Sequence, residues 1–212
     1  MSRIVAISGA PGSGKSTLAR GLAAALGDAA VVHMDHYEHA TALPIEAIAR
    51  WMERGADYDE LPIPLLADHL DALRRGSAVT DPMTREAIPP AAWILFETQF
   101  GRVHHPTGRH IDLLVWLDTP PDIALARTLL QSTRVALHGG RADAAQLAWT
   151  EGYLANYLTV VRQLVLMQKA RVGAVADIVL DGEDGPDALV ARARDEILRR
   201  AQAQATAQAA RE

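Results

Sequence analysis

The residues that point most clearly to chemistry form a short glycine-rich loop near the start of the chain. Gly9-Ala10-Pro11-Gly12-Ser13-Gly14-Lys15-Ser16 fits the pattern G-x-x-x-x-G-K-[ST]. The glycines allow the backbone to curl so that successive N–H groups point at phosphate oxygens. Lys15 supplies a cation for the β and γ phosphates, the Ser16 hydroxyl can ligate Mg²⁺, and Thr17 follows in the same turn. The loop therefore predicts a nucleotide phosphate site with Mg²⁺.

The choice between ATP and GTP depends on a second signature. GTP-binding proteins usually carry an Asn/Thr-Lys-x-Asp segment that reads guanine. The only lysines of this chain are Lys15 and Lys169, and Gln168-Lys169-Ala170-Arg171 does not fit that pattern. We therefore expect ATP as the bound nucleotide.

Two acids stand at the ends of apolar runs that read as strands. Asp35 follows Val31 to Met34, and Glu97 follows Trp93 to Phe96. Ligands of parallel α/β sheets bind at the carboxyl ends of the strands. One acid would orient or deprotonate an acceptor hydroxyl, and the other would hold Mg²⁺ directly or through water. The sequence leaves open which acid is nearer the metal, and the alternative is that either acid caps a helix or faces solvent.

The histidines around Asp35 invite comparison with a metal site. His33, His36 and His39 are close in sequence. A change from strand to loop at this point would scatter their side chains, and the chain has no cysteine to complete a zinc site. We therefore do not expect structural zinc.

The elements that must position these residues alternate between strands and helices. Such alternation predicts a mostly parallel sheet covered on both faces. We expect an α/β P-loop NTPase fold with about five strands and a small lid, in a single domain over residues 1–212. The lid is expected near residues 132–145 and an acceptor-binding insertion near 36–90. The expected strands are 4–7, 30–34, 93–96, 113–117 and 178–180, and the expected helices are 16–26, 63–75, 123–130, 146–172 and 186–200.

Composition narrows the class of partner. The formal net charge of the 212 residues is −5, which argues against a nucleic-acid partner because such binding depends on many Lys and Arg contacts to phosphate. No apolar run approaches the length of a membrane span, so we expect no membrane partner. The absence of cysteine favours the cytoplasm. The sequence leaves a homo-oligomer open.

The residues in order along the chain resemble the uridine kinase and phosphoribulokinase branch of the P-loop kinases. Asp35-His36-Tyr37 is similar to that family's Asp-x-Phe-Tyr segment, and Tyr58-Asp59-Glu60-Leu61 to its Phe-Asp element. The run 93–97 is similar to its strand ending in Glu-Gly. The late segments 118–127, 157–163 and 176–180 also resemble family elements.

This resemblance implies transfer of the ATP γ-phosphoryl group to a hydroxyl of a small metabolite. Asp35 would be the base, with Tyr37 beside it, and Asp59 would bind acceptor hydroxyls. Arg127 and a lid arginine, Arg141 or Arg134, would neutralise the transferring phosphoryl group. A nucleoside or a sugar-like alcohol is the first acceptor class, and pantothenate, nicotinamide riboside or a free sugar are alternatives.

Departures from the family pattern fall on the acceptor side and the lid. Glu97 is followed by Thr98 instead of glycine. The family's Pro-x-Tyr-Asp acceptor segment is assigned to Pro82-Met83-Thr84-Arg85, which lacks the aromatic residue and the acid. Thr128 and Gln131 stand where the lid is usually basic. ATP use is therefore better supported than uridine as the acceptor, and the competing function is an ATP-hydrolysing switch without a small-molecule acceptor.

Overall fold

A central parallel sheet organises the chain in the computed structural model, which describes residues 1–37, 44–139 and 144–209. Its five strands lie in the order β2-β5-β1-β6-β7, and every neighbouring pair is parallel. The strands are β1 (Arg3–Gly9), β2 (Ala29–His33), β5 (Trp93–Glu97), β6 (Leu113–Asp118) and β7 (Ile178–Asp181). β1 lies in the centre of the sheet, with β2 and β5 on one side and β6 and β7 on the other. The loop after β1 therefore lies where the strand order reverses, which is the usual ligand position of such sheets.

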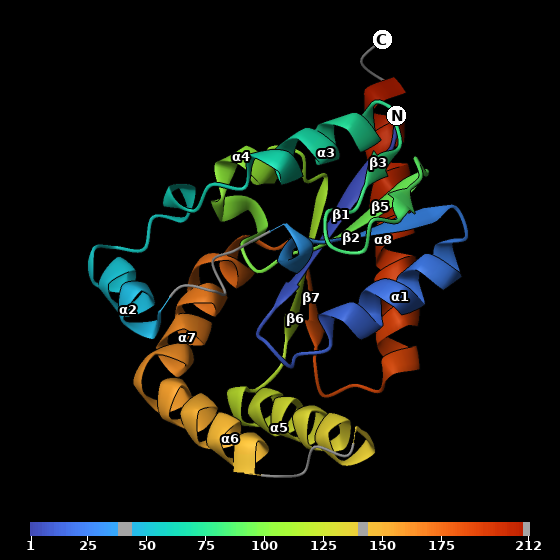
Figure 1. Cartoon of the computed structure of the whole chain (residues 1–212). Helices are drawn as coiled ribbons and strands as arrows, with labels where there is room; N and C mark the ends of the chain where they lie inside the picture. Colours follow the sequence, from blue (N-terminus) through green and yellow to red (C-terminus); the bar gives the residue numbers. More distant parts are fainter. Residues whose placement is uncertain (38–43, 140–143, 210–212) are drawn as a thin grey trace.

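Side chains of β1 alternate between the two faces of the sheet, and each face has its own core. Val5 and Ile7 pack with α1 (Lys15–Leu26) and α8 (Pro186–Ala209). Ile4 and Ala6 pack on the opposite face with α3 (Pro64–Arg74) and the segments around it. Figure 1 shows α1 and α8 side by side on one side of the sheet. The sheet is therefore covered on both faces, as strands buried on both sides require.

A long excursion separates β2 from β5. It holds the 3₁₀ turn η1 (Met34–His36), α2 (Ile45–Glu53), the turn η3 (Tyr58–Glu60), α3 and a short hairpin. The hairpin pairs β3 (Val79–Thr80) with β4 (Ala87–Ile88) in antiparallel register. After β5 come η4 (Gly101–Val103) and α4 (His105–Gly108). Figure 1 places α2 far from the sheet, at the outer end of this excursion.

A second group of helices lies between β6 and β7. It begins with α5 (Pro121–His138) and continues through α6 (Ala144–Asn156), the π-helical turn η5 (Tyr157–Val161), α7 (Arg162–Arg171) and the short turn η6 (Gly173–Val175). The turn η5 contacts α2, so the two excursions meet. Among the described residues, no helix combines the length and the apolar character that a membrane crossing needs.

The sequence expectations for the fold are confirmed: the five strands, their parallel order and the flanking helices all agree with the P-loop NTPase class. One difference concerns the expected lid. Residues 132–138 continue α5 as regular helix, because Pro121 starts the helix and no proline or glycine interrupts it before Gly139. The division of the chain into one domain with a lid and an acceptor insertion stays a prediction.

Candidate active site

The phosphate loop joins β1 to α1 with the backbone geometry that its glycines allow. Gly12 has φ +78° and Gly14 has φ +105°, both in the left-handed region. A Cβ atom on Gly12 would lie 2.2 Å from the carbonyl oxygen of Ala124, so this position has no room for a side chain. Ser16 and Thr17 follow in the first turn of α1 and are exposed. The structure therefore presents the loop predicted from the sequence at the N-terminus of a 12-residue helix.

Charged and hydroxyl groups converge beside this loop. The Lys15 ammonium donates to the carbonyl oxygens of Gly9 at 3.0 Å and Ala10 at 3.1 Å. The Ser16 hydroxyl donates to Oε1 of Glu97 at 2.7 Å. Burial lowers the pKa of Lys15, and the negative charges of Glu97 and Asp35 oppose this shift. Both strand-end acids are therefore close enough to act on the loop lysine.

Glu97 stands at the carboxyl end of β5 and is only 9% exposed. Its second oxygen, Oε2, lies 2.7 Å from Nδ1 of His33, which ends the neighbouring strand β2. Burial alone would raise the pKa of Glu97. Hydrogen bonds from His33 and Ser16 and the charge of Lys15 outweigh burial and hold that pKa below its ordinary value. Glu97 is therefore an ionised acid fixed at both oxygens.

Asp35 lies in the turn η1, directly after β2, and its side chain is exposed. Its Oδ1 accepts a 3.3 Å hydrogen bond from Nε2 of Gln99. The carboxylate therefore has few restraints of its own, although it lies beside the phosphate loop. This placement agrees with an acid that acts on a ligand, and the base role assigned to Asp35 stays a prediction.

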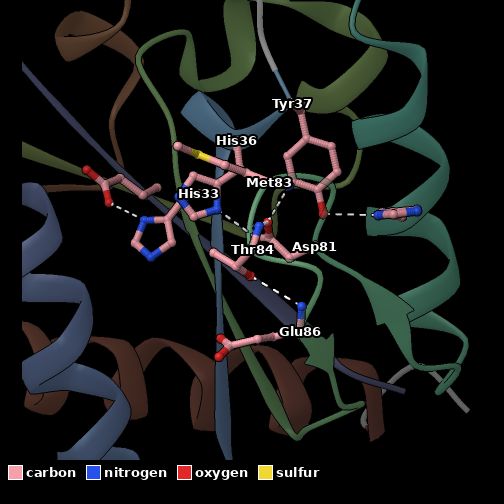
Figure 2. A network of polar contacts seen from close by, with 9 residues as sticks. His33, His36, Tyr37, Asp81, Met83, Thr84 and Glu86 are labelled. Atoms are coloured by element: carbon pink, nitrogen blue, oxygen red, sulfur yellow. Dashed lines mark hydrogen bonds and ion pairs between the residues drawn. The ribbon is translucent and has the colours of Figure 1, made fainter.

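Tyr37 and His36, which follow Asp35 in the chain, each pair with a side chain of another element. The Tyr37 hydroxyl lies 3.0 Å from Nδ1 of His69 on α3, and burial raises the pKa of Tyr37 to about 12. Nδ1 of His36 lies 2.6 Å from Oδ2 of Asp81, which is 5% exposed. Figure 2 shows the His33 and His36 rings close to each other, with Asp81 in the turn that carries Met83 and Thr84.

Asp81 lies directly before the segment Pro82–Arg85, which itself carries no acid. Oδ1 of Asp81 accepts hydrogen bonds from the backbone N–H groups of Met83 and Thr84, both at 2.9 Å. An aspartate whose side chain accepts backbone N–H groups two and three residues later forms an Asx turn. In the sequence, the pair Asp81-Pro82 was the available signal for this turn.

His33 and His36 are not joined at a common site. His33 and His36 each pair with a carboxylate on a different element. Within residues 1–37, 44–139 and 144–209, no three His, Cys, Asp or Glu side chains come together as metal ligands. His39 lies outside the described residues.

Asp59 lies on η3 and is bound by the segment after β5. Its two oxygens accept hydrogen bonds from the backbone N–H of His105 at 2.8 Å and from Nδ1 of the same residue at 2.6 Å. The hydrogen bond from His105 lowers the pKa of Asp59. Among the described residues, no hydrogen bond or ion pair joins the Asp59 carboxylate to Asp35 or to the phosphate loop. Its role toward an acceptor stays a prediction.

The predicted phosphoryl-neutralising arginines have different surroundings. Nη1 of Arg127 donates to the carbonyl oxygens of Gly182 at 3.0 Å and Ser13 at 3.4 Å. It therefore ties α5 to the phosphate loop and to the segment after β7. Arg134 is exposed two turns further along α5. Arg141 lies outside the described residues.

The residues fit the triphosphate and the metal that the loop pattern implies. The Ser13 hydroxyl is buried inside the loop and has no hydrogen-bond partner in the part of the chain that the structure describes. The Ser16 hydroxyl and the Glu97 carboxylate supply hard oxygen ligands next to each other, which is the donor type that Mg²⁺ prefers.

Known proteins give an independent comparison. No protein-family model matches the chain. A curated uridine kinase of Chloroflexus aggregans is 28% identical over 194 residues, which is 84% of this chain and 86% of that protein. A curated uridine kinase of Chloroflexus aurantiacus is 27% identical over 193 residues, with the same shares.

Solved structures with a related arrangement are also kinases. A shikimate kinase from Acinetobacter baumannii has a TM-score of 0.49 at 18% identity and covers 96% of this chain and 95% of its own. A possible uridine kinase from Bacillus stearothermophilus has a TM-score of 0.47 at 19% identity and covers 85% of this chain and 89% of its own. These scores are too low to bear on the substrate.

The curated relatives confirm the resemblance to uridine kinases along most of the chain. The sheet order, the phosphate loop and the acids beside it agree with that relationship. The chain is a small-molecule kinase with the P-loop fold.

Proposed function

We propose that the chain transfers the γ-phosphoryl group of ATP to a hydroxyl of a nucleoside or of a related sugar-like alcohol. The observation that carries this proposal is that the phosphate loop with Lys15, the turn with Asp35 and the acid Glu97 all lie at or directly after the carboxyl ends of the neighbouring parallel strands β1, β2 and β5. The phosphate-binding cation is Lys15, the acid held at both oxygens is Glu97, and the exposed acid is Asp35. A phosphoryl transferase needs both, because one acid serves the metal and the other serves the acceptor.

The phosphate loop has the donor role in this proposal. Backbone N–H groups of residues 9–16 and the start of α1 bind the phosphates, and Lys15 balances their charge. Ser16 and Glu97 would hold Mg²⁺, directly or through water. Bound there, Mg²⁺ would supply positive charge that offsets the negative charge developing during transfer.

The acceptor lies on the Asp35 side of the site. Asp35 orients the acceptor hydroxyl and takes its proton as the oxygen attacks the γ-phosphorus, while the bond from that phosphorus to the β,γ-bridging oxygen breaks and ADP leaves. Tyr37, Asp59, Glu97 and Arg134 are the further residues proposed to contact the acceptor. Arg127 and Arg141 are proposed to offset charge on the transferring group.

The acceptor class rests on the relatives named uridine kinase. At 28% identity or less, the pocket can differ from theirs, so pantothenate, nicotinamide riboside and free sugars belong in the same test. ADP release is measured with ATP and Mg²⁺ while nucleosides, sugars and vitamin precursors are added one at a time. The proposal predicts that one class accelerates ADP release. Release that no acceptor changes, and that a protein partner stimulates, would indicate an ATP-hydrolysing switch.

A further inference from the structure

The turn that carries Asp35 is fixed by its neighbours in the chain. His33 comes two residues before Asp35, and its Nδ1 lies 2.7 Å from Oε2 of Glu97. His36 comes directly after, and its Nδ1 lies 2.6 Å from Oδ2 of Asp81. Both carboxylates belong to buried side chains. The turn is therefore tied to β5 on one side and to the β3–β4 hairpin on the other.

The remaining contacts of Asp81 determine what His36 does. Oδ1 of Asp81 already accepts the backbone N–H groups of Met83 and Thr84, so Oδ2 is the oxygen left for His36. An ionised carboxylate can only accept hydrogen bonds, so His36 must donate from Nδ1. One imidazole thus connects the turn η1 to the backbone of the hairpin.

The two histidine rings also touch. Their centroids are 5.0 Å apart with the planes tilted by 40°. In Figure 2 the contacts run from His33 through the His36 ring to Asp81 and its turn. Together with the bond from Ser16 to Glu97, they form a continuous path from the phosphate loop to the hairpin. Asp35 lies between the two histidines in the sequence, and its own side chain accepts a 3.3 Å hydrogen bond from Gln99.

We propose that His36, fixed by Asp81, is a positioning residue for phosphoryl transfer: it holds the turn that presents Asp35 and ties the hairpin to that turn. This inference rests on the proposed function, because Asp35 is the proposed base. His36 acts through the position of Asp35 and not by touching the reacting atoms.

The first experiment compares His36→Ala with His36→Asn. Alanine removes the donor to Asp81, and we expect kcat to fall by about 10- to 100-fold, the scale of lost supporting contacts, while the KM for ATP changes by less than about twofold. The side-chain N–H of asparagine can replace Nδ1–H, so His36→Asn should recover most of kcat. His110→Ala is the control, because His110 is a buried histidine away from Asp35, and its loss should lower stability without lowering kcat.

A second readout does not depend on any acceptor. Hydrogen exchange should accelerate at the amides of Met83 and Thr84 and at the Tyr37 amide, which donates to Met34, when His36 becomes Ala. Exchange in β1 should stay unchanged. If the natural chain phosphorylates no acceptor, the proposed function fails. The exchange result then still decides whether His36 holds the turn η1 and the hairpin together.

Two results would overturn the inference. One is wild-type kcat and wild-type exchange in His36→Ala. The other is an equal loss of kcat in His36→Ala and His36→Asn with unchanged exchange, because that pattern would mean that the ring itself contacts the substrate.

Discussion

The Ser16 hydroxyl donates a 2.7 Å hydrogen bond to Oε1 of Glu97, and this bond joins the first turn of α1 to the end of β5. The two groups come from positions far apart in the sequence, and only the parallel pairing of β1 with β5 brings them together. Two oxygen ligands fixed against each other beside a phosphate loop are the basis of the proposed Mg²⁺ site.

The charge of Glu97 is therefore expected to matter for the metal. Glu97→Gln keeps an oxygen for Ser16 and removes the charge. The Mg²⁺ concentration for half-maximal activity should rise by about 10- to 100-fold, as when support of a metal site is lost. Glu86→Gln, an exposed acid on the hairpin, is the control. An unchanged Mg²⁺ titration would remove Glu97 from the metal site.

Asp35 is expected to act in the chemical step and not in nucleotide binding. Asp35→Asn keeps an oxygen for Gln99 and removes the proton acceptor. We expect kcat to fall at least about 100-fold, the scale of a lost general base, with little change in ATP affinity. Asp68→Asn, an exposed acid on α3, should leave both values unchanged. Near-normal turnover in Asp35→Asn would show that another group takes the proton.

Asp81 should make stability depend on pH. Burial alone would raise its pKa, but hydrogen bonds from His36, Thr84 and Met83 hold that pKa below its ordinary value. Such a carboxyl stabilises the folded state at pH values above its unfolded pKa of about 3.9, and this contribution is lost as the pH falls through the folded pKa.

The measurement is the free energy of unfolding of the natural chain and of Asp81→Asn at several pH values. The natural chain should be more stable at about pH 6, and the difference should shrink by about pH 3. A difference that stays constant over this range would mean that the Asp81 pKa is the same in both states.

Arg127 is expected to support nucleotide binding through the loop that it holds. Arg127→Ala leaves the carbonyl groups of Ser13 and Gly182 without this donor, so we expect ATP affinity to fall by about tenfold, equivalent to about one hydrogen bond to a charged group. Arg192→Ala is the matched control, because Arg192 pairs with Asp184 on the surface. Unchanged ATP affinity would show that Arg127 does not act through the loop, and a large loss of kcat alone would leave it only its proposed role at the transferring phosphoryl group.

Much of the fold was predictable because it depends on local patterns. The apolar runs ending at Asp35, Glu97 and Asp118 gave three strands directly, and Gly27 and Gly76 marked two helix ends. The helix over 123–130 was predicted too short, because the polar residues after Leu130 lie on its solvent side and resemble a loop. The helix α2 was missed although Ile45, Ile48 and Met52 follow helical spacing, which was the available signal.

The candidate site was predictable only in part. The phosphate loop is a contiguous pattern, so its residues and their order were clear. The pairs Glu97–His33, Asp81–His36 and Asp59–His105 join separate elements, and no local spacing encodes them. His33 and His36 were weighed together as metal ligands, whereas each is bonded to a different acid.

The central claim is transfer of a phosphoryl group to a small-molecule hydroxyl, and product mass tests it most directly. The natural chain is incubated with ATP, Mg²⁺ and each acceptor that accelerates ADP release, with Asp35→Asn in parallel. We predict that the acceptor gains one phosphoryl group in step with ADP, and that Asp35→Asn forms product far more slowly. ADP formed together with inorganic phosphate, while every acceptor keeps its original mass, would contradict the claim.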